Sequence, residues 1–506
     1  MNMKKIIISL LISIAFAACK KEAPPNIVLI LADDLGYSEL GSYGQKHIET
    51  PNIDELGKNG MTFTQFYSGA PVCAPARCIL LTGKHAGHAF IRGNDEWGIR
   101  GDVWDFAKAV EDPGLEGQRP IPDSLVTVAE LLQTAGYTTA CIGKWGLGAP
   151  FTEGAPNNQG FDLFYGYNCQ RQAHTYYPKH LWKNEEKVWL SNKLVVPGTK
   201  LEEGADPLDE NSYTNYTLEE YAPDLMFNET IQFLEENHKD PFFLYFATPI
   251  PHVPLQAPDS LTHYYRDKFG EEHPYLGEQG YFPTFTPRAT YAAMVTYLDI
   301  QVGLIVQKLK DLGVYDNTII MFTSDNGPTY AGGADSRFFD SAAPFSSIHG
   351  RGKGSVYEGG IRVPFIVQWP EKVMPGSTSD HQAAFYDFFP TLCELAGIDK
   401  QVETDGLSMV SVFAGSDHPD QHEFLYWEYP ATGGQQAIRM DNWKGVRRNL
   451  FKGNLDIELY DLSSDIGETR NVASENPEVV KEIEHIMSEQ HEASEIDRFK
   501  FEILED

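Results

Sequence analysis

The stretch IVLILADDLG (residues 27–36) decides the fold class, because a short apolar run rich in β-branched side chains ends at two adjacent carboxylates. Such a run has the length and composition of a buried strand. Similar runs follow at 137–142, 242–247, 318–322 and 361–368. Amphipathic stretches of helical length separate them, at 126–134, 225–236 and 291–312. Strands that alternate with helices predict βαβ units and a mostly parallel sheet covered by helices on both faces.

Two of these strands end in residues with the chemistry of a metal site. Asp33 and Asp34 follow the first strand, and the run at 318–322 leads to Asp325 and Asn326. Ligands of open α/β sheets bind at the carboxyl ends of strands, so we expect these side chains to meet. Carboxylate and amide oxygens suit Ca²⁺, with Mg²⁺ as the alternative, better than Zn²⁺, which prefers His and Cys. Taken singly, each pair is also compatible with a solvated turn.

The segment CAPARCILLTG (73–83) places a cysteine at the start of a predicted helix. Pro75 suits the first helical turn, and the apolar residues from Ile79 carry the helix inward. Cys73 would then lie at a helix N-terminus, which favours thiolates and bound oxyanions, and Arg77 one turn later adds a fixed cation. The alternative for a lone cysteine is a small buried hydrophobic residue.

Three further candidates lie on predicted loops. Lys144 belongs to GKWGLG, directly after the strand at 137–142. His252 is held between prolines in TPIPHVP after the strand at 242–247, where an imidazole can titrate and pass protons, although a surface histidine is the alternative. Lys353 lies among glycines, which let the backbone approach a ligand closely.

These motifs together resemble those of the formylglycine-dependent sulfatases, which carry C-x-P-x-R, A-D-D-x-G, S-D-N-G, G-K-W and G-x-K with a downstream E-G-G-x-R-V-P. The resemblance implies an alkaline-phosphatase-like α/β sandwich that hydrolyses sulfate esters. It implies that a maturase oxidises Cys73 to formylglycine, which attacks sulfur, and that His252 protonates the leaving oxygen. The implied metal ligands are Asp33, Asp34, Cys73, Asp325 and Asn326. The implied catalytic residues are Cys73, Arg77, Lys144, His252 and Lys353.

One position departs from the family pattern. The family has a histidine in G-K-W-H-L-G where this chain has Gly146. Either another histidine replaces it or the elimination step is handled differently. The candidates in the sequence are His85, His88 and His349.

A change of pattern near residue 416 predicts a second unit. Short strand-like runs occur at 423–429, 436–440 and 443–447, and a helix is predicted over 477–490. We therefore expect a catalytic domain over 26–415 and a small C-terminal α+β subdomain over 416–506.

The N-terminus resembles a bacterial lipoprotein signal. A basic start and a short apolar run predict a signal peptide over 1–18, and the ending AAC places Cys19 at a lipobox. Residues 19–25 would then be a lipidated tether, and ordinary secretion after Ala18 is the alternative. These features predict anchoring in the bacterial cell envelope, in the periplasm or at the outer membrane.

The formal net charge of −32 excludes nucleic acid and disfavours direct binding to anionic membranes. Because this negative charge repels an anionic substrate, such a substrate would require a local group of positively charged residues around the site. Aromatic and hydrogen-bonding residues in two loop segments suggest carbohydrate subsites, and resemble segments of polysaccharide-degrading sulfatases that act on galactose-type sugars. The predicted substrate contacts are Arg92, Arg171, His174 and Trp427. The alternatives are a phosphomonoester or phosphodiester hydrolase on the same fold, and a lipid-anchored glycan-binding protein without catalysis.

Overall fold

The computed structural model describes residues 24–504 apart from 347, 349, 400 and 401. The predicted signal peptide and Cys19 lie outside the described residues. The main body is built on a ten-stranded sheet. In spatial order its strands are β11 (Ser377–Ser379), β2 (Met61–Phe63), β10 (Phe365–Gln368), β9 (Thr318–Ser324), β1 (Asn26–Ala32), β8 (Phe242–Ala247), β4 (Thr138–Lys144), β5 (Leu163–Tyr167), β6 (His180–Lys183) and β7 (Glu186–Trp189).

The centre of this sheet is parallel, and both flanks contain antiparallel pairs, although the edge strand β11 pairs in parallel with β2. β1 pairs in parallel with β8 and β9, and β4 pairs in parallel with β5 and β8. β10, β6 and β7 run antiparallel to their neighbours. The predicted mostly parallel α/β architecture is therefore confirmed.

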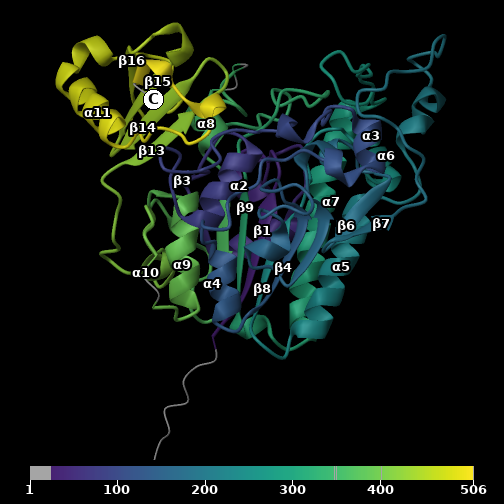
Figure 1. Ribbon diagram of the computed structural model, residues 1–506, viewed down its shortest axis with the longest axis horizontal. Coiled ribbons are helices and arrows are strands. Elements are labelled where there is room, and N and C mark those ends of the chain that lie inside the picture. Colours follow the sequence, from purple (N-terminus) through teal and green to yellow (C-terminus); the bar gives the residue numbers. More distant parts are fainter. Residues whose placement is uncertain (1–23, 347, 349, 400–401, 505–506) are drawn as a thin grey trace, which may run out of the picture.

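Helices cover both faces of the sheet (Figure 1). One face packs against α2 (Cys73–Thr82), α4 (Val128–Thr134) and α9 (Phe388–Leu395). The other packs against α1 (Pro51–Lys58), α5 (Ala222–Asn237) and α7 (Pro287–Asp311), with α6 (Asp259–Phe269) against α7. In β1, Ile27, Leu29 and Leu31 enter the first core and the residues between them enter the second, because successive side chains of a strand point to opposite faces.

Helix α7 is the one described helix long and apolar enough to cross a membrane, but 67% of its most apolar window is buried inside the fold. We therefore interpret α7 as a helix of the protein core. The remaining short elements are β3 (Phe66–Tyr67), α3 (Phe106–Glu111), α8 (Glu358–Ile361), β12 (Ala383–Ala384) and α10 (Val410–Phe413).

The strand predicted over 361–368 is shorter than expected. Residues 358–361 form the helical turn α8, and β10 starts only at Phe365. Pro364 explains the boundary, because proline has no N–H to donate to a strand ladder.

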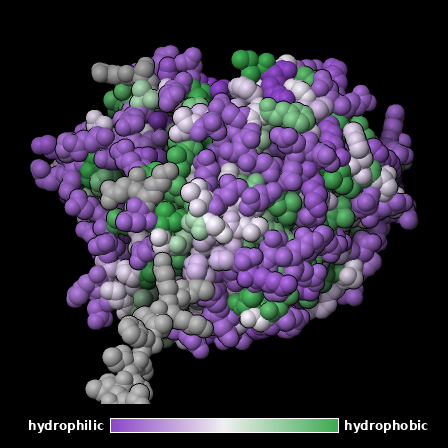
Figure 2. Space-filling model, turned by 60° about the horizontal axis from the view of Figure 1, so that its bottom comes forward, coloured by the Kyte–Doolittle hydropathy of each residue, from purple (hydrophilic) through white to green (hydrophobic). Residues whose placement is uncertain are grey.

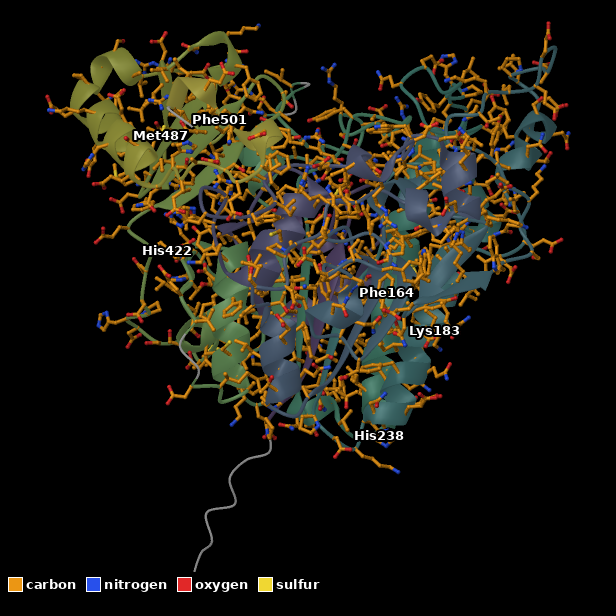
Figure 3. The ribbon with its side chains drawn as sticks, viewed as in Figure 1. Phe164, Lys183, His238, His422, Met487 and Phe501 are labelled. Atoms are coloured by element: carbon orange, nitrogen blue, oxygen red, sulfur yellow. The ribbon has the colours of Figure 1, made fainter. Side chains whose placement is uncertain are left out.

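A separate antiparallel sheet forms the C-terminal subdomain, at the upper left of Figure 1. Its strands lie in chain order: β13 (Leu425–Tyr429), β14 (Gln435–Met440), β15 (Trp443–Arg448) and β16 (Ile457–Asp461). Helix α11 (Pro477–Glu489) packs on it through Ile483 and Met487, the latter labelled in Figure 3. The predicted small α+β unit is confirmed.

On the face shown in Figure 2, hydrophilic residues cover most of the surface and hydrophobic residues form small separate groups. This agrees with the strongly acidic composition of the chain.

Candidate active site

The register of β1 and β9 creates the acidic half of the site. Ala32 pairs with Ser324, so the residues that follow the two strands emerge side by side. The Asp325 N–H donates to the Ala32 carbonyl at 3.0 Å, and the Asp34 N–H donates to Asp325 Oδ1 at 3.1 Å. The predicted meeting of Asp33, Asp34, Asp325 and Asn326 is therefore what the structure shows.

Cys73 is the first residue of α2 and lies directly against these carboxylates. Its Sγ is 3.4 Å from Asp33 Oδ1, 3.4 Å from Lys144 Nζ and 3.6 Å from Lys353 Nζ. Only 1% of the residue is exposed. Burial, with Asp325 and Asp33 nearby, raises the pKa of the thiol well above its usual range. From its place at a helix N-terminus, Cys73 was expected to favour the thiolate form. Burial and the two nearby carboxylates have the larger effect and favour the neutral thiol, so the unmodified side chain is a poor nucleophile.

Three cations balance the three carboxylates. Arg77 Nη2 lies 2.8 Å from Asp325 Oδ2 and 3.3 Å from Asp33 Oδ2. Lys144 Nζ lies 2.7 Å from Asp33 Oδ2, and Lys353 Nζ lies 2.6 Å from Asp34 Oδ1. A buried ion is tolerated only when it is paired in this way. Arg77 and Lys144 are sealed in, whereas the Lys353 side chain is 19% exposed and faces the approach to the site.

The carboxylates do not titrate alike. Burial acts to raise the pKa of Asp33, but Lys144, His252 and Arg77 together hold it well below its usual range. Burial raises the pKa of Asp34 against the opposing effect of Lys353. For Asp325, burial and the charge on Asp33 raise the pKa to about 6 despite Arg77. Without further positive charge, three ionised carboxylates are therefore hard to maintain here.

The oxygen atoms fit a divalent cation. Asn326 Nδ2 donates to Asp34 Oδ1 at 2.8 Å, but its buried Oδ1 has no hydrogen-bond partner among the described residues. Potential ligand atoms of Asp33, Asp34 and Cys73 lie within 4.8 Å of one another, together with one from His252. An unpartnered amide oxygen beside three carboxylates is the donor set that Ca²⁺ or Mg²⁺ accepts.

His252, on the loop after β8, faces the same centre. Its Nδ1 donates to the Val253 carbonyl, which leaves Nε2 pointing inward, 3.7 Å from Asp34 Oδ2. Burial lowers the pKa of the imidazole, and the cations Lys353 and Lys144 lower it further. The ring of His174 stacks against that of His252 with centroids 5.7 Å apart.

The predicted substrate contacts divide into two groups. His174 and Arg171 lie on the 3-10 helix at 170–174, and His174 reaches the centre through its stacking on His252. Arg92 and Trp427 do not reach it, and both predictions are wrong. Arg92 is 4% exposed and donates to Glu428 and to the Glu492 carbonyl. Trp427 is fully buried in β13, and its indole N–H donates to the Ser68 carbonyl.

Gly146 adopts φ +86°, and Gln170 fills the space beside it. A Cβ on Gly146 would lie 3.0 Å from Cγ and Nε2 of Gln170. The Gln170 amide reaches Asn94 Oδ1 at 3.4 Å, and the same oxygen accepts from the Ala74 N–H at 3.1 Å. The sequence analysis did not identify Gln170 or Asn94 as part of the site. The one available signal was Gly146 itself, because a glycine after a strand leaves room for the side chain of a neighbouring residue.

Two of the three histidines considered as replacements lie elsewhere. His85 and His88 lie beyond the far end of α2, which at 10 residues is about 15 Å long. There they contact Gln490 and Asp405. His349 lies outside the described residues.

Comparison with known proteins identifies the family. A family model described as Sulfatase matches residues 25–398, which is most of the chain. The chain belongs to the sulfatase family. A second model, described as N-sulphoglucosamine sulphohydrolase, C-terminal, matches residues 351–495.

Relatives of this sulfatase cover nearly its whole length. It is 30% identical to human arylsulfatase A over 94% of this chain and 90% of that protein. It is also 30% identical to human N-acetylgalactosamine-6-sulfatase, over 85% and 74%. A crystal structure of Ps i-CgsB in complex with k-i-k-neocarrahexaose is 28% identical, with a TM-score of 0.71 and 92% of each chain covered. The protein is accordingly a sulfuric ester hydrolase.

Proposed function

We propose that this sulfatase removes sulfate esters from carbohydrate, with galactose-type sugars favoured, and that it uses Ca²⁺ and a formylglycine derived from Cys73. The observation that carries the proposal is the ring of carboxylates, cations and one unpartnered amide oxygen around Cys73 Sγ. Asp33, Asp34, Asp325 and Asn326 would hold the cation together with residue 73.

The charge balance of the site favours a sulfate ester. The three aspartates and the three cations, Arg77, Lys144 and Lys353, sum to zero when all are ionised. A bound divalent cation would supply Lewis acidity and two positive charges, and an aldehyde hydrate at residue 73 would supply the attacking oxygen. A singly charged ester thus meets a positive pocket inside a molecule of net charge −32.

The roles of this chain's own residues follow from their positions. Lys144 and Lys353 place ammonium groups beside the attacking position and stabilise charge on the sulfuryl oxygens. Arg77 holds Asp33 and Asp325 and donates through Nη1 to the Lys144 carbonyl, which fixes all three in place. The Nδ1 proton of His252 is held by the Val253 carbonyl, which leaves Nε2 facing the centre. The negative charge of a bound sulfate ester would favour a second proton on the ring, taken from solvent, and Nε2 would hand that proton to the leaving oxygen.

The sugar preference rests on two similarities. One relative is an N-acetylgalactosamine-6-sulfatase, and one solved relative holds a neocarrahexaose. We also propose that a maturase produces the formylglycine and that Cys19 carries a lipid anchor in the bacterial envelope. The sequence pattern at the N-terminus supports the anchor.

The test is sulfate release from defined sulfated galactose and N-acetylgalactosamine saccharides, compared with the matching phosphate esters. We expect the sulfate esters to be hydrolysed faster, and mass spectrometry of the peptide containing residue 73 to show a carbonyl in place of the thiol. Cys73→Ala should abolish activity, whereas Cys78→Ala, another fully buried cysteine on the same helix, should retain it. Faster phosphate hydrolysis, or full activity of Cys73→Ala, would refute the proposal.

A further inference from the structure

A group of polar side chains beside the reaction centre has unused hydrogen-bonding atoms. Glu96 Oε2 and Arg171 Nε are buried and lack partners among the described residues, and so does Asn168 Oδ1. Buried polar atoms are nearly always paired, so unpaired ones gathered in one place point to a missing ligand or ordered water.

Backbone connections tie this group to the reaction centre. Arg171 follows β5, the neighbour of β4, and β4 ends at Lys144. Glu96 lies two residues after Asn94, which accepts from the Ala74 N–H next to Cys73. Asp95 anchors the loop between them through ion pairs with Arg119 and Arg498. The group is thus held on two segments, the loop at 94–96 and the 3-10 helix at 170–174, which Asn94 links to each other and to the residue after Cys73.

An exposed tryptophan adjoins the same group. Trp104 is 62% exposed, yet its position is fixed, because Arg171 Cζ lies 4.8 Å from the ring centroid and Arg171 Nη2 donates to the Trp104 carbonyl at 2.8 Å. A large aromatic ring that is rigid and open to solvent is a platform on which the apolar face of a sugar ring stacks.

The charges on this group complement a sugar. Glu96 offers carboxylate oxygens to hydroxyl donors, and Arg171 offers N–H groups to hydroxyl or ring oxygens. Burial raises the pKa of the Glu96 carboxyl to about 7, although the positive charges of Arg171 and Lys144 act to lower it. The mixture of one acid, one cation and one aromatic platform matches a carbohydrate unit better than a second isolated sulfate.

We propose that Glu96, Trp104 and Arg171 form a second sugar subsite, which binds the unit adjoining the sulfated one. The inference rests on the proposed carbohydrate sulfatase function and adds a consequence to it. The enzyme should prefer a sulfated oligosaccharide over the corresponding sulfated monosaccharide, because only the longer substrate reaches Trp104.

The experiment compares kcat/KM on a sulfated monosaccharide and on an oligosaccharide that carries the same sulfated unit. Trp104→Ala, Arg171→Ala and Glu96→Gln should each lower the oligosaccharide-to-monosaccharide ratio by about tenfold, mainly through KM. Trp189→Ala is the matched control: Trp189 is 56% exposed with Lys187 over its ring at 5.2 Å, but it lies on the outermost strand β7. It should leave the ratio unchanged. Thermal unfolding of each variant checks that it is folded.

Two outcomes separate failure of the subsite from failure of the proposed function. If the wild type releases sulfate from both saccharides and the three subsite variants keep its ratio, the subsite is refuted and the function stands. If the wild type releases sulfate from neither, the proposed function is refuted and the subsite with it. If a variant is unfolded, the remaining two decide, since Trp104 contributes mostly exposed surface and Glu96→Gln preserves side-chain shape.

Discussion

Replacing Gly146 by alanine should destabilise the folded protein through two separable effects. The φ of +86° lies in the left-handed region, where a residue with a Cβ costs about 1–2 kcal/mol more than glycine. The new Cβ would also lie 3.0 Å from two atoms of Gln170, closer than ordinary van der Waals contact. Relieving that contact displaces the amide that reaches Asn94. The lower entropy of the unfolded alanine chain offsets about 0.4–1 kcal/mol, which leaves a backbone cost of about 0–1.6 kcal/mol, and the displaced Gln170 contact adds to it.

A double-mutant cycle separates the two effects. In a Gln170→Ala background the contact is gone and only the backbone cost remains, so Gly146→Ala should cost less there than in the wild type. Gly136→Ala is the matched control, because Gly136 has φ +91° and nothing within 4 Å of its added Cβ. The assay is urea unfolding followed by tryptophan fluorescence, with equal slopes required for all variants. An equal cost of Gly146→Ala in both backgrounds would refute the role assigned to Gln170.

Calcium binding, the buried Glu39 carboxyl and the loop residue His252 provide three further tests. Adding Ca²⁺ to chelator-treated protein should raise the thermal midpoint, and Asn326→Ala should reduce that rise, because it removes the unpartnered amide oxygen; stoichiometric zinc in elemental analysis of the purified enzyme would contradict the oxygen-ligand assignment. Glu39 follows β1, is fully buried, and accepts hydrogen bonds from the Gly36 N–H and the Tyr291 hydroxyl. Burial raises the pKa of its carboxyl from 4.5 to about 7, so its protonation contributes folding stability that is fully present below about pH 4.5 and is lost as pH rises through 7, by up to about 3 kcal/mol. The thermal midpoint of Glu39→Gln should therefore fall less than that of the wild type between pH 6 and pH 8, and parallel curves would argue against an ionising Glu39. His252→Ala should slow a sugar sulfate about 10²-fold or more and an activated aryl sulfate much less, because only the sugar needs a proton to leave; equal losses on both, with a sulfated protein seen by intact mass, would assign His252 to elimination instead.

The sequence predicted the acidic half of the site because one structural rule governs it. Residues after adjacent parallel strands must emerge together, and the pairing of Ala32 with Ser324 puts Asp33 next to Asp325 without any help from side-chain packing. The strands β1, β4, β8 and β9 and the helices α4, α5 and α7 were likewise predicted from their patterns, whereas the helix α6 and the strands β5, β6 and β7 were missed. The two- and three-residue strands β2, β3, β11 and β12 were not predicted, because so short a run carries no periodic signal.

The errors at Arg92 and Trp427 have a shared cause. Both were assigned to substrate from residue type, but β13 lies between two packed layers: Trp427 faces the main core, while Tyr426 faces the small core under α11. A strand buried on both sides shows no alternation from which exposure can be inferred. The burial of Arg92 could not be predicted either, because its ion-pair partner Glu428 is far away in sequence. Gln170 could not be found because its contact with Gly146 depends on two loops that only the folded chain brings together.

The burial of Cys73 also sets an order of events in biosynthesis. The cysteine is 1% exposed at the start of a helix that is buried along its whole length. The far end of that helix is covered by the segment that follows α11, where Gln490 contacts His85 and the Gln490 carbonyl lies close to Gly87. An enzyme that makes the proposed formylglycine must therefore reach the cysteine before the C-terminal subdomain has packed against this helix. Under the proposed chemistry, a cell that folds this protein faster than it modifies it would accumulate a correctly folded but inactive product.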